Sequence, residues 1–116
     1  MVDNPTTTEK DLVAASATPI VLGILARGES YGYAILKEIR DRSNGTLDWS
    51  EGMLYPVLHR LELRGLLRSR WATSDEGRRR KCYQLSKAGR AKMAEGRTAW
   101  QTVDAVLRRL WREAHA

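Results

Sequence analysis

Cysteine, histidine and long apolar runs are scarce in this sequence, and each shortage excludes a class of site. The single cysteine, Cys82, excludes an internal disulfide and a metal site built from several cysteines. The two histidines are far apart and have no ligand-like neighbours. The longest uncharged run, Leu12–Ala26, is shorter than the ~20 residues of a membrane-spanning helix. We therefore expect a cytoplasmic protein with no membrane segment, no cofactor and no metal.

Patterns typical of catalysis are also missing. No nucleophile with a base, carboxylate pair or phosphate-cradling glycine loop occurs at a usable spacing, so we expect no enzyme activity. The composition is ordinary for one folded domain: 116 residues, 42% of them hydrophobic and 29% charged. A net charge of +6 favours a polyanionic partner.

The positive charge is concentrated in one stretch. Residues 60–81 contain eight Lys and Arg side chains against three Asp and Glu side chains, which gives +5 of the total +6. A basic run is commonly no more than a solvated surface. Here it adjoins a helix with an unusual exposed face, and this combination favours a nucleic-acid partner.

That helix is predicted over Ser50–Arg64. Its apolar residues recur with the i, i+3, i+4, i+7 spacing of one buried stripe: Leu54, Val57, Leu58 and Leu61. The opposite face carries a glycine, a proline and a histidine where a solvated helix usually has Glu, Lys and Gln, and Tyr55 and Arg60 lie at its flanks. We interpret this segment as a helix that reads DNA.

Two helices are predicted before the reading helix. Thr18-Pro19 is a typical helix start, and Ser30 is expected to cap a second helix over Tyr31–Arg42. Met1–Thr8 is expected to fray. Three helices in this order, joined by short turns, form a helix-turn-helix scaffold in which the third helix is the reader.

A β-hairpin is predicted after the reading helix. Strands over Leu66–Thr73 and Cys82–Leu85 flank a turn at Ser74–Gly77 and a basic loop, and Thr46–Trp49 is β-prone enough to add a third strand. Strand alternation turns three side chains toward the helices: Trp71, Tyr83 and Leu85. A helix-turn-helix followed by a basic hairpin is a winged helix.

Ser86 is expected to cap a final helix that runs to about Glu113. Two offset heptad series give it the a/d pattern of a helix that packs along a partner: Met93, Trp100, Leu107 and Ala114, with Gly96, Val103 and Leu110. The partner is either the rest of the domain or a second copy. We favour a second copy because Val106 and Trp111 widen an apolar surface that a monomer would leave exposed.

The expected fold is mainly α with a small β-hairpin. It consists of a winged helix-turn-helix DNA-binding domain over residues 1–85 and a C-terminal dimerisation helix over residues 86–116.

Three segments of the chain resemble the PadR family of bacterial transcriptional regulators: ARGESYGYAILKEI (Ala26–Ile39), EGMLYPVLHRLELRGLL (Glu51–Leu67) and GRRRKCYQLSKAGR (Gly77–Arg90). The single C-terminal helix makes the chain similar to the short-tailed branch, whose members dimerise through the last helix and the N-terminal helix. Cys82 departs from the family pattern, in which an aromatic residue is common. The resemblance implies a homodimeric regulator of transcription, and we expect a repressor on a near-palindromic operator.

Phosphate contacts supply most of the affinity for DNA, and contacts to base edges supply specificity. The four cations after Gly77 are assigned to phosphates or the minor groove, and one of them is expected to face inward or to pair with Asp75 or Glu76. His59 and Arg60 are the expected base readers. Tyr31 is either a core aromatic or a phosphate contact. The full predicted DNA-contact set is Tyr31, Ser50, Gly52, Tyr55, Pro56, His59, Arg60, Gly77, Arg78, Arg79, Arg80 and Lys81.

Trp100 carries a second hypothesis, a site for a small-molecule effector. In a two-fold dimer its indole would face its mate across the interface, either as plain dimer core or as one wall of a slot for a planar aromatic compound. Asp104 would favour a cationic compound. The expected lining is Leu12, Val13, Ser16, Trp100, Val103 and Asp104.

An alternative function remains on the sequence alone. A winged helix whose basic surface binds an acidic protein would need no sequence-specific DNA binding. This alternative predicts that the protein shows no preference among duplex sequences.

Overall fold

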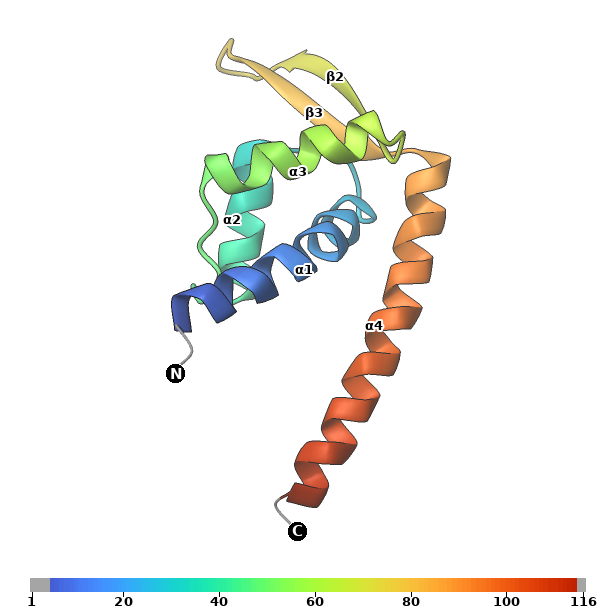
Figure 1. Ribbon diagram of the computed structural model, residues 1–116. Helices are drawn as coiled ribbons and strands as arrows, with labels where there is room; N and C mark the ends of the chain where they lie inside the picture. The colour runs from blue at the N-terminus through green and yellow to red at the C-terminus, as the bar shows by residue number, and fades with distance from the viewer. Residues whose placement is uncertain (1–4, 115–116) are drawn as a thin grey trace.

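A computed structural model of the chain describes residues 5–114, with side chains from Asp11 onward (Figure 1). Helices α1 (Pro5–Leu25), α2 (Gly32–Arg42) and α3 (Glu51–Leu63) form a compact head, with the short strand β1 (Ser30–Tyr31) between the first two. Strands β2 (Leu67–Thr73) and β3 (Arg79–Leu85) form a hairpin beside α3, and the long helix α4 (Lys87–Ala114) ends the chain. This is the predicted winged helix-turn-helix with a long C-terminal helix.

Helix α1 differs from the prediction at both its start and its middle. It runs without interruption from Pro5 through Pro19 to Leu25, so the helix start predicted at Thr18-Pro19 is wrong. Pro5–Thr8, expected to fray, is helical, whereas Met1–Asn4 lie outside the described residues. The proline is tolerated because one buried stripe continues across it: Val13, Ala17, Val21, Leu22, Ile24 and Leu25 pack into the core.

The three strands form one antiparallel sheet in the order β1-β3-β2. The hairpin register runs from Leu67 opposite Leu85 to Thr73 opposite Arg79. The third strand is Ser30–Tyr31, which pairs with β3, and not Thr46–Trp49 as predicted. Trp49 is instead buried in the core at 5% exposure, so the segment before α3 is a loop held by its side chain.

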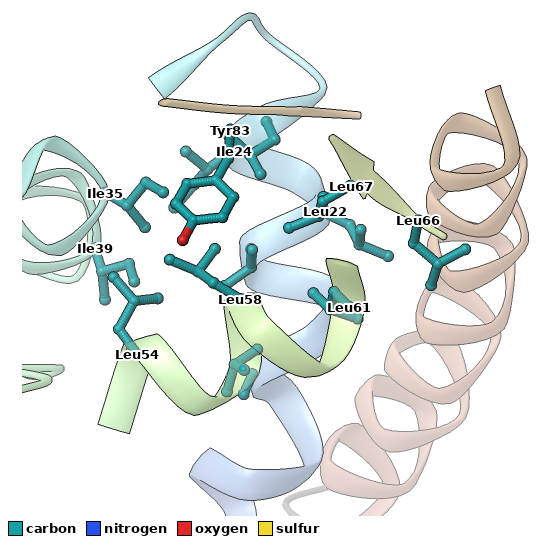
Figure 2. Close-up of a cluster of buried hydrophobic side chains, with 14 of the residues drawn as sticks. Leu22, Ile24, Ile35, Ile39, Leu54, Leu58, Leu61, Leu66, Leu67 and Tyr83 are labelled. Carbon is teal, nitrogen blue, oxygen red and sulfur yellow. The ribbon is translucent and has the colours of Figure 1, made fainter. Parts of the chain in front are cut away.

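The core lies between the three helices of the head and one face of the sheet (Figure 2). The predicted stripe of α3 is confirmed, because all four of its apolar residues are buried. Tyr83 and Leu85 join them from β3 as expected. Trp71 does not: its side chain is 58% exposed, because the hairpin extends beyond the part of the sheet that the helices cover.

Helix α4 starts on the head and then leaves it. The Ser86 hydroxyl donates to the Gly65 carbonyl oxygen at 2.6 Å and accepts from the Gly89 amide at 3.0 Å, which confirms Ser86 as the cap. Residues 97–114 are all exposed, and this half of the helix extends away from the head (Figure 1). Packing of the whole helix on its own domain is therefore excluded. Within residues 5–114, no helix combines the length and apolarity that a membrane crossing requires.

Candidate nucleic-acid interface

Hydrogen bonds at both ends of helix α3 set where it begins and ends, and they therefore determine which of its faces is exposed. At its start the Ser50 side chain accepts from the Met53 amide at 3.3 Å. At its end Gly65 adopts φ 76°, and the Leu66 amide donates to the Leu61 carbonyl oxygen at 3.0 Å. The predicted contact residues of this helix are then exposed together: Gly52, Tyr55, Pro56, His59 and Arg60. Apart from the ring of Tyr55, which packs against α2, no described part of the chain covers this face.

Tyr55 is positioned by a residue that sequence reasoning missed. Its phenol packs against Gly32 at the start of α2, where an added Cβ would overlap the Tyr55 hydroxyl and ring. Gly32 is buried, and its φ is not in the left-handed region, so the glycine is needed for close approach and not for a turn. The available signal was a glycine at the first position of a helix, next to two tyrosines.

The wing tip is a tight turn with acidic residues at its end. The Ser74 amide donates to the Arg78 carbonyl oxygen at 2.7 Å, and Gly77 has φ 83°. Asp75 and Glu76 are exposed at the tip. The basic residues lie further back, because β3 begins at Arg79 and not at Cys82 as predicted.

Lys81 points toward α3 and is held there. Its Nζ lies 3.4 Å from Glu62 Oε1, and the Ser69 hydroxyl donates to the other oxygen of the same carboxylate. The Ser69 hydrogen bond, with Lys81, holds the pKa of Glu62 below its ordinary value. The expectation that one wing cation turns inward is therefore confirmed, but its partner is Glu62 and not Asp75 or Glu76. Lys81 is correspondingly less available to a phosphate than its three neighbours.

Two arginines of β3 are stacked on aromatic rings. Arg79 Cζ lies 4.8 Å from the Trp71 ring centroid, and Arg80 Cζ lies 4.1 Å from the Tyr31 ring centroid. Because neighbouring residues of a strand point to opposite faces, the two guanidinium groups leave the hairpin on different sides. Tyr31 is half-buried beneath Arg80, so it supports that arginine directly.

A bidentate ion pair neutralises one further cation of the basic stretch. Arg70 on β2 donates to Glu29 at 2.9 and 2.6 Å, which lowers the pKa of Glu29 and raises that of Arg70. Among the side chains that the structure describes, the other cations of residues 60–81 form no ion pair: Arg60, Arg64, Arg68, Arg78, Arg79 and Arg80. These six arginines are the cations of the basic stretch that no described acidic side chain neutralises.

The residues predicted to hold an effector lie on two helices. Leu12, Val13 and Ser16 are on α1, where Val13 packs against the core and the Ser16 hydroxyl donates to the Leu12 carbonyl oxygen at 2.8 Å. Trp100, Val103 and Asp104 are on the exposed half of α4. Asp104 is already paired with Arg108 at 2.7 Å, which reduces the negative charge expected to attract a cation.

An open helix beside a basic hairpin on a three-helix head defines a winged helix-turn-helix protein. Residues 21–95 match the model of the Transcriptional regulator PadR-like family. The chain belongs to this family, which makes it a transcriptional regulator and not an enzyme.

Two solved structures match more of the chain than the family segment, and one relative matches a shorter stretch at higher identity. A transcriptional regulator from Clostridium thermocellum superimposes with a TM-score of 0.76 at 27% identity, over 85% of this chain and 96% of that one. A PadR family transcription regulator from Clostridium difficile R20291 gives a TM-score of 0.74 at 28% identity, over 82% and 97%. The transcriptional regulator Rv3488 of Mycobacterium tuberculosis is 52% identical over 50 residues, which are 43% of this chain and 46% of that protein.

Proposed function

We propose that the protein is a homodimeric, sequence-specific DNA-binding repressor that responds to a small molecule. The observation that carries the proposal is the exposed face of α3, together with six arginines of residues 60–80 that have no acidic partner among the described side chains. A DNA major groove admits an α-helix, and the phosphates along its borders attract arginine side chains.

The contacts divide between reading and positioning. His59 and Arg60 on α3 are proposed to contact base edges, and a guanidinium group suits the two acceptors of guanine. Pro56 offers an apolar surface to a thymine methyl group. Positioning on phosphates falls to three wing arginines, Arg78–Arg80, with Tyr55 and the amides at the start of α3 near Gly52.

A homodimer is supported by the exposed apolar side chains of α4. Trp100, Val103, Leu107 and Leu110 follow the predicted seam and have no cover within the described chain. Large apolar patches of this kind are typical of protein interfaces. Residues 86–116 are accordingly proposed as the dimerisation element of the winged helix domain of residues 1–85, and a two-fold dimer predicts a near-palindromic operator.

An effector is proposed to bind between the two copies of Trp100, which is 42% exposed in one chain. A planar aromatic compound stacked there would shift DNA binding only by favouring one dimer arrangement over another. Titration with a cationic planar dye should quench tryptophan fluorescence, and Trp100→Ala should remove most of that binding. Equal dye affinity in both proteins would exclude this site.

The function is tested by selecting bound duplexes from a random pool and measuring the mass of the protein in solution. A sequence-specific regulator should enrich a near-palindrome and bind it at least about 1,000-fold above random DNA. Binding should also weaken steeply with salt. Recovery of no common sequence would favour the alternative, a winged helix that meets an acidic protein partner.

A further inference from the structure

Trp71 on β2 is a large aromatic side chain that the core does not use, since it is 58% exposed. Strands favour tryptophan, and single apolar side chains are common on protein surfaces, so exposure alone gives Trp71 no function. What distinguishes it is a charged group on its ring. Arg79 Cζ lies 4.8 Å from the ring centroid, which is within the range of a cation–π contact.

The register of the hairpin places this pair on the side of the reading helix. Trp71 lies opposite Lys81, and Arg79 is two residues before Lys81 on β3, so the three side chains leave the same face of the sheet. Lys81 Nζ lies 3.4 Å from Glu62 of α3, which identifies that face as the one toward α3. Trp71 and Arg79 continue this face outward along the hairpin.

The same face carries a second cation beside an aromatic ring, but a carboxylate already holds it. Lys81 Nζ lies 5.6 Å from the Tyr83 ring centroid and is paired with Glu62. Arg79 has no acidic partner among the described side chains. Of these two cations on the α3 side of β3, Arg79 is therefore the one whose charge no described carboxylate offsets.

Arg80 is turned to the other face of the sheet. Its Cζ lies 4.1 Å from the ring centroid of Tyr31, which pairs with Cys82 on the same face. Arg70 also lies opposite Cys82, and it is held there by Glu29. The two faces of the wing therefore differ, because the aromatic ring under Arg80 lies on β1, away from α3, whereas the ring under Arg79 lies on the α3 side.

We propose that Trp71 is a positioning residue for DNA binding. It holds the guanidinium group of Arg79 on the α3 side of the wing, toward the phosphates beside the groove that α3 enters. A free arginine side chain samples many rotamers and loses that freedom when it binds a phosphate. A ring beneath the planar guanidinium group restricts it before DNA binds and leaves the N–H groups at its edge free to donate.

The proposal rests on the DNA-binding function proposed above and deepens it. Among the wing arginines, it makes Arg79 the one that the duplex on α3 engages most strongly. Arg79→Ala should therefore weaken binding to a random-sequence duplex more than Arg80→Ala does. Equal losses for the two variants would show that the face of the strand does not decide which arginine binds.

Replacing the ring while keeping every charge is the direct test. Trp71→Ala should weaken binding to random-sequence and selected duplexes by about threefold for each wing, and so about tenfold for a dimer, because an exposed cation–π contact is lost. The slope of affinity against salt should stay unchanged, since no cation has been removed, whereas Arg79→Ala should lower it. A lowered slope for Trp71→Ala would contradict a positioning role.

Two further replacements separate the aromatic ring from its volume. Trp71→Tyr should retain most of the affinity, whereas Trp71→Leu, which keeps apolar volume without an aromatic face, should behave like Trp71→Ala. Thr73→Ala is the matched control, because Thr73 is exposed and lies directly opposite Arg79 but supplies no ring, and it should leave affinity unchanged. Urea unfolding verifies the stability of each variant. Equal affinities of the Tyr and Leu variants would overturn the ring contact.

A double-mutant cycle shows whether Trp71 acts through Arg79. In an Arg79→Ala background, Trp71→Ala should cause no further loss of affinity. A similar loss in both backgrounds would show that Trp71 acts independently of Arg79, and it would overturn this proposal while leaving the DNA-binding function intact. A wild-type protein that binds no duplex would overturn the proposed function, and the role of Trp71 with it.

Discussion

Single side chains decide which charges of the basic stretch remain available to DNA. Arg70 and Lys81 are engaged by Glu29 and Glu62, so their charge is partly neutralised within the protein. Arg60 on α3 and Arg79 on the wing have no acidic partner among the described side chains, and they occupy different elements. The two arginines are therefore expected to fail in different ways when removed.

Arg60→Ala should relax sequence preference, with a loss of about 1–3 kcal/mol of discrimination at one base pair, because a guanidinium group reads guanine through two hydrogen bonds. Arg79→Ala should instead weaken binding to all duplexes and lower the salt slope by about one. Affinities for the operator, a single-base variant and random DNA, each measured over a salt series, separate these results. Equal losses on all three duplexes for both variants would contradict the assignment.

Three helical glycines should respond to alanine in a fixed order. At Gly89 the new Cβ would overlap the backbone carbonyl of Leu66, which cannot move without displacing the sheet. At Gly32 it would overlap the Tyr55 side chain, which can rotate at some cost to the interface. At Gly96 it would meet nothing within 4 Å.

Gly89→Ala should therefore lower the stability of the folded protein the most, by ~4 kcal/mol, which is near the upper end for point mutants. Gly32→Ala should cost less, about 1–2 kcal/mol, and should also weaken DNA binding. Gly96→Ala should leave the protomer unchanged or gain up to about 1 kcal/mol of helix propensity. Urea unfolding gives the order, and a Gly32→Ala protein as stable as Gly96→Ala would show that Tyr55 does not require the glycine.

Between elements, Glu62 joins the reading helix to the wing. Its carboxylate holds Ser69 of β2 and Lys81 of β3 on α3, and these contacts keep its pKa below the ordinary 4.5. A lowered pKa means that the folded state favours the ionised carboxylate. The resulting stability is fully present above pH 4.5 and is lost as the pH falls through the lowered folded value.

Glu62→Gln should lower stability by about 1 kcal/mol at neutral pH, because a neutral amide replaces a charge-assisted hydrogen bond. The loss should shrink as the pH falls below 4.5 and vanish below the lowered pKa of the folded protein, where the wild-type carboxylate is protonated as well. Thermal unfolding of the wild type and of Glu62→Gln from pH 3 to pH 7 measures this loss of stability. Glu51→Gln, a change at an exposed carboxylate on the same helix, serves as the control, and identical pH profiles for all three proteins would show that Glu62 does not hold the wing.

The elements that sequence predicted well are those whose signals are local. The span of α3 was predicted within about one residue at each end, because Ser50, the apolar stripe and Gly65 all lie within the helix or beside it. Strand β1 was missed because its partner lies some fifty residues away in β3, so nothing near Ser30 announces the pairing. The start of α1 was misplaced because packing of its buried stripe outweighs the local effect of Pro19.

The candidate interface shows the same division. Periodicity predicts the open face of α3, and it also predicts the cap at Ser50 and the exposed position of Gly52. The pairing of Lys81 with Glu62 could not be predicted, since it depends on how the hairpin folds back over the helix. Likewise, Trp71 was expected to face the core because alternation gives the face of a strand but not how far the helices cover it.

At the scale of the whole molecule, the chain has one winged-helix head and one long helix whose second half is not covered by any described residue. The head has its own core, while residues 97–114 of α4 are exposed and would gain cover from a second chain in the proposed homodimer. A two-fold axis through that helix would set the distance and the relative rotation of two reading helices. The spacing between the two half-sites of the operator should therefore reveal the distance and relative rotation of the two heads in the proposed dimer.

Half-sites for such a dimer lie about 34 Å apart, one helical turn or about ten base pairs, so both α3 helices reach the same side of the duplex. Inserting about five base pairs should turn one half-site to the far side and weaken binding at least about 100-fold, because only one head can then read its site. Inserting about ten returns the site to the correct side but moves it farther away, so affinity should recover only if α4 allows the heads to separate. A duplex with one half-site provides the single-head reference. If the affinity were the same at every spacing, each head would be binding alone, and α4 would not be fixing the separation of the two heads.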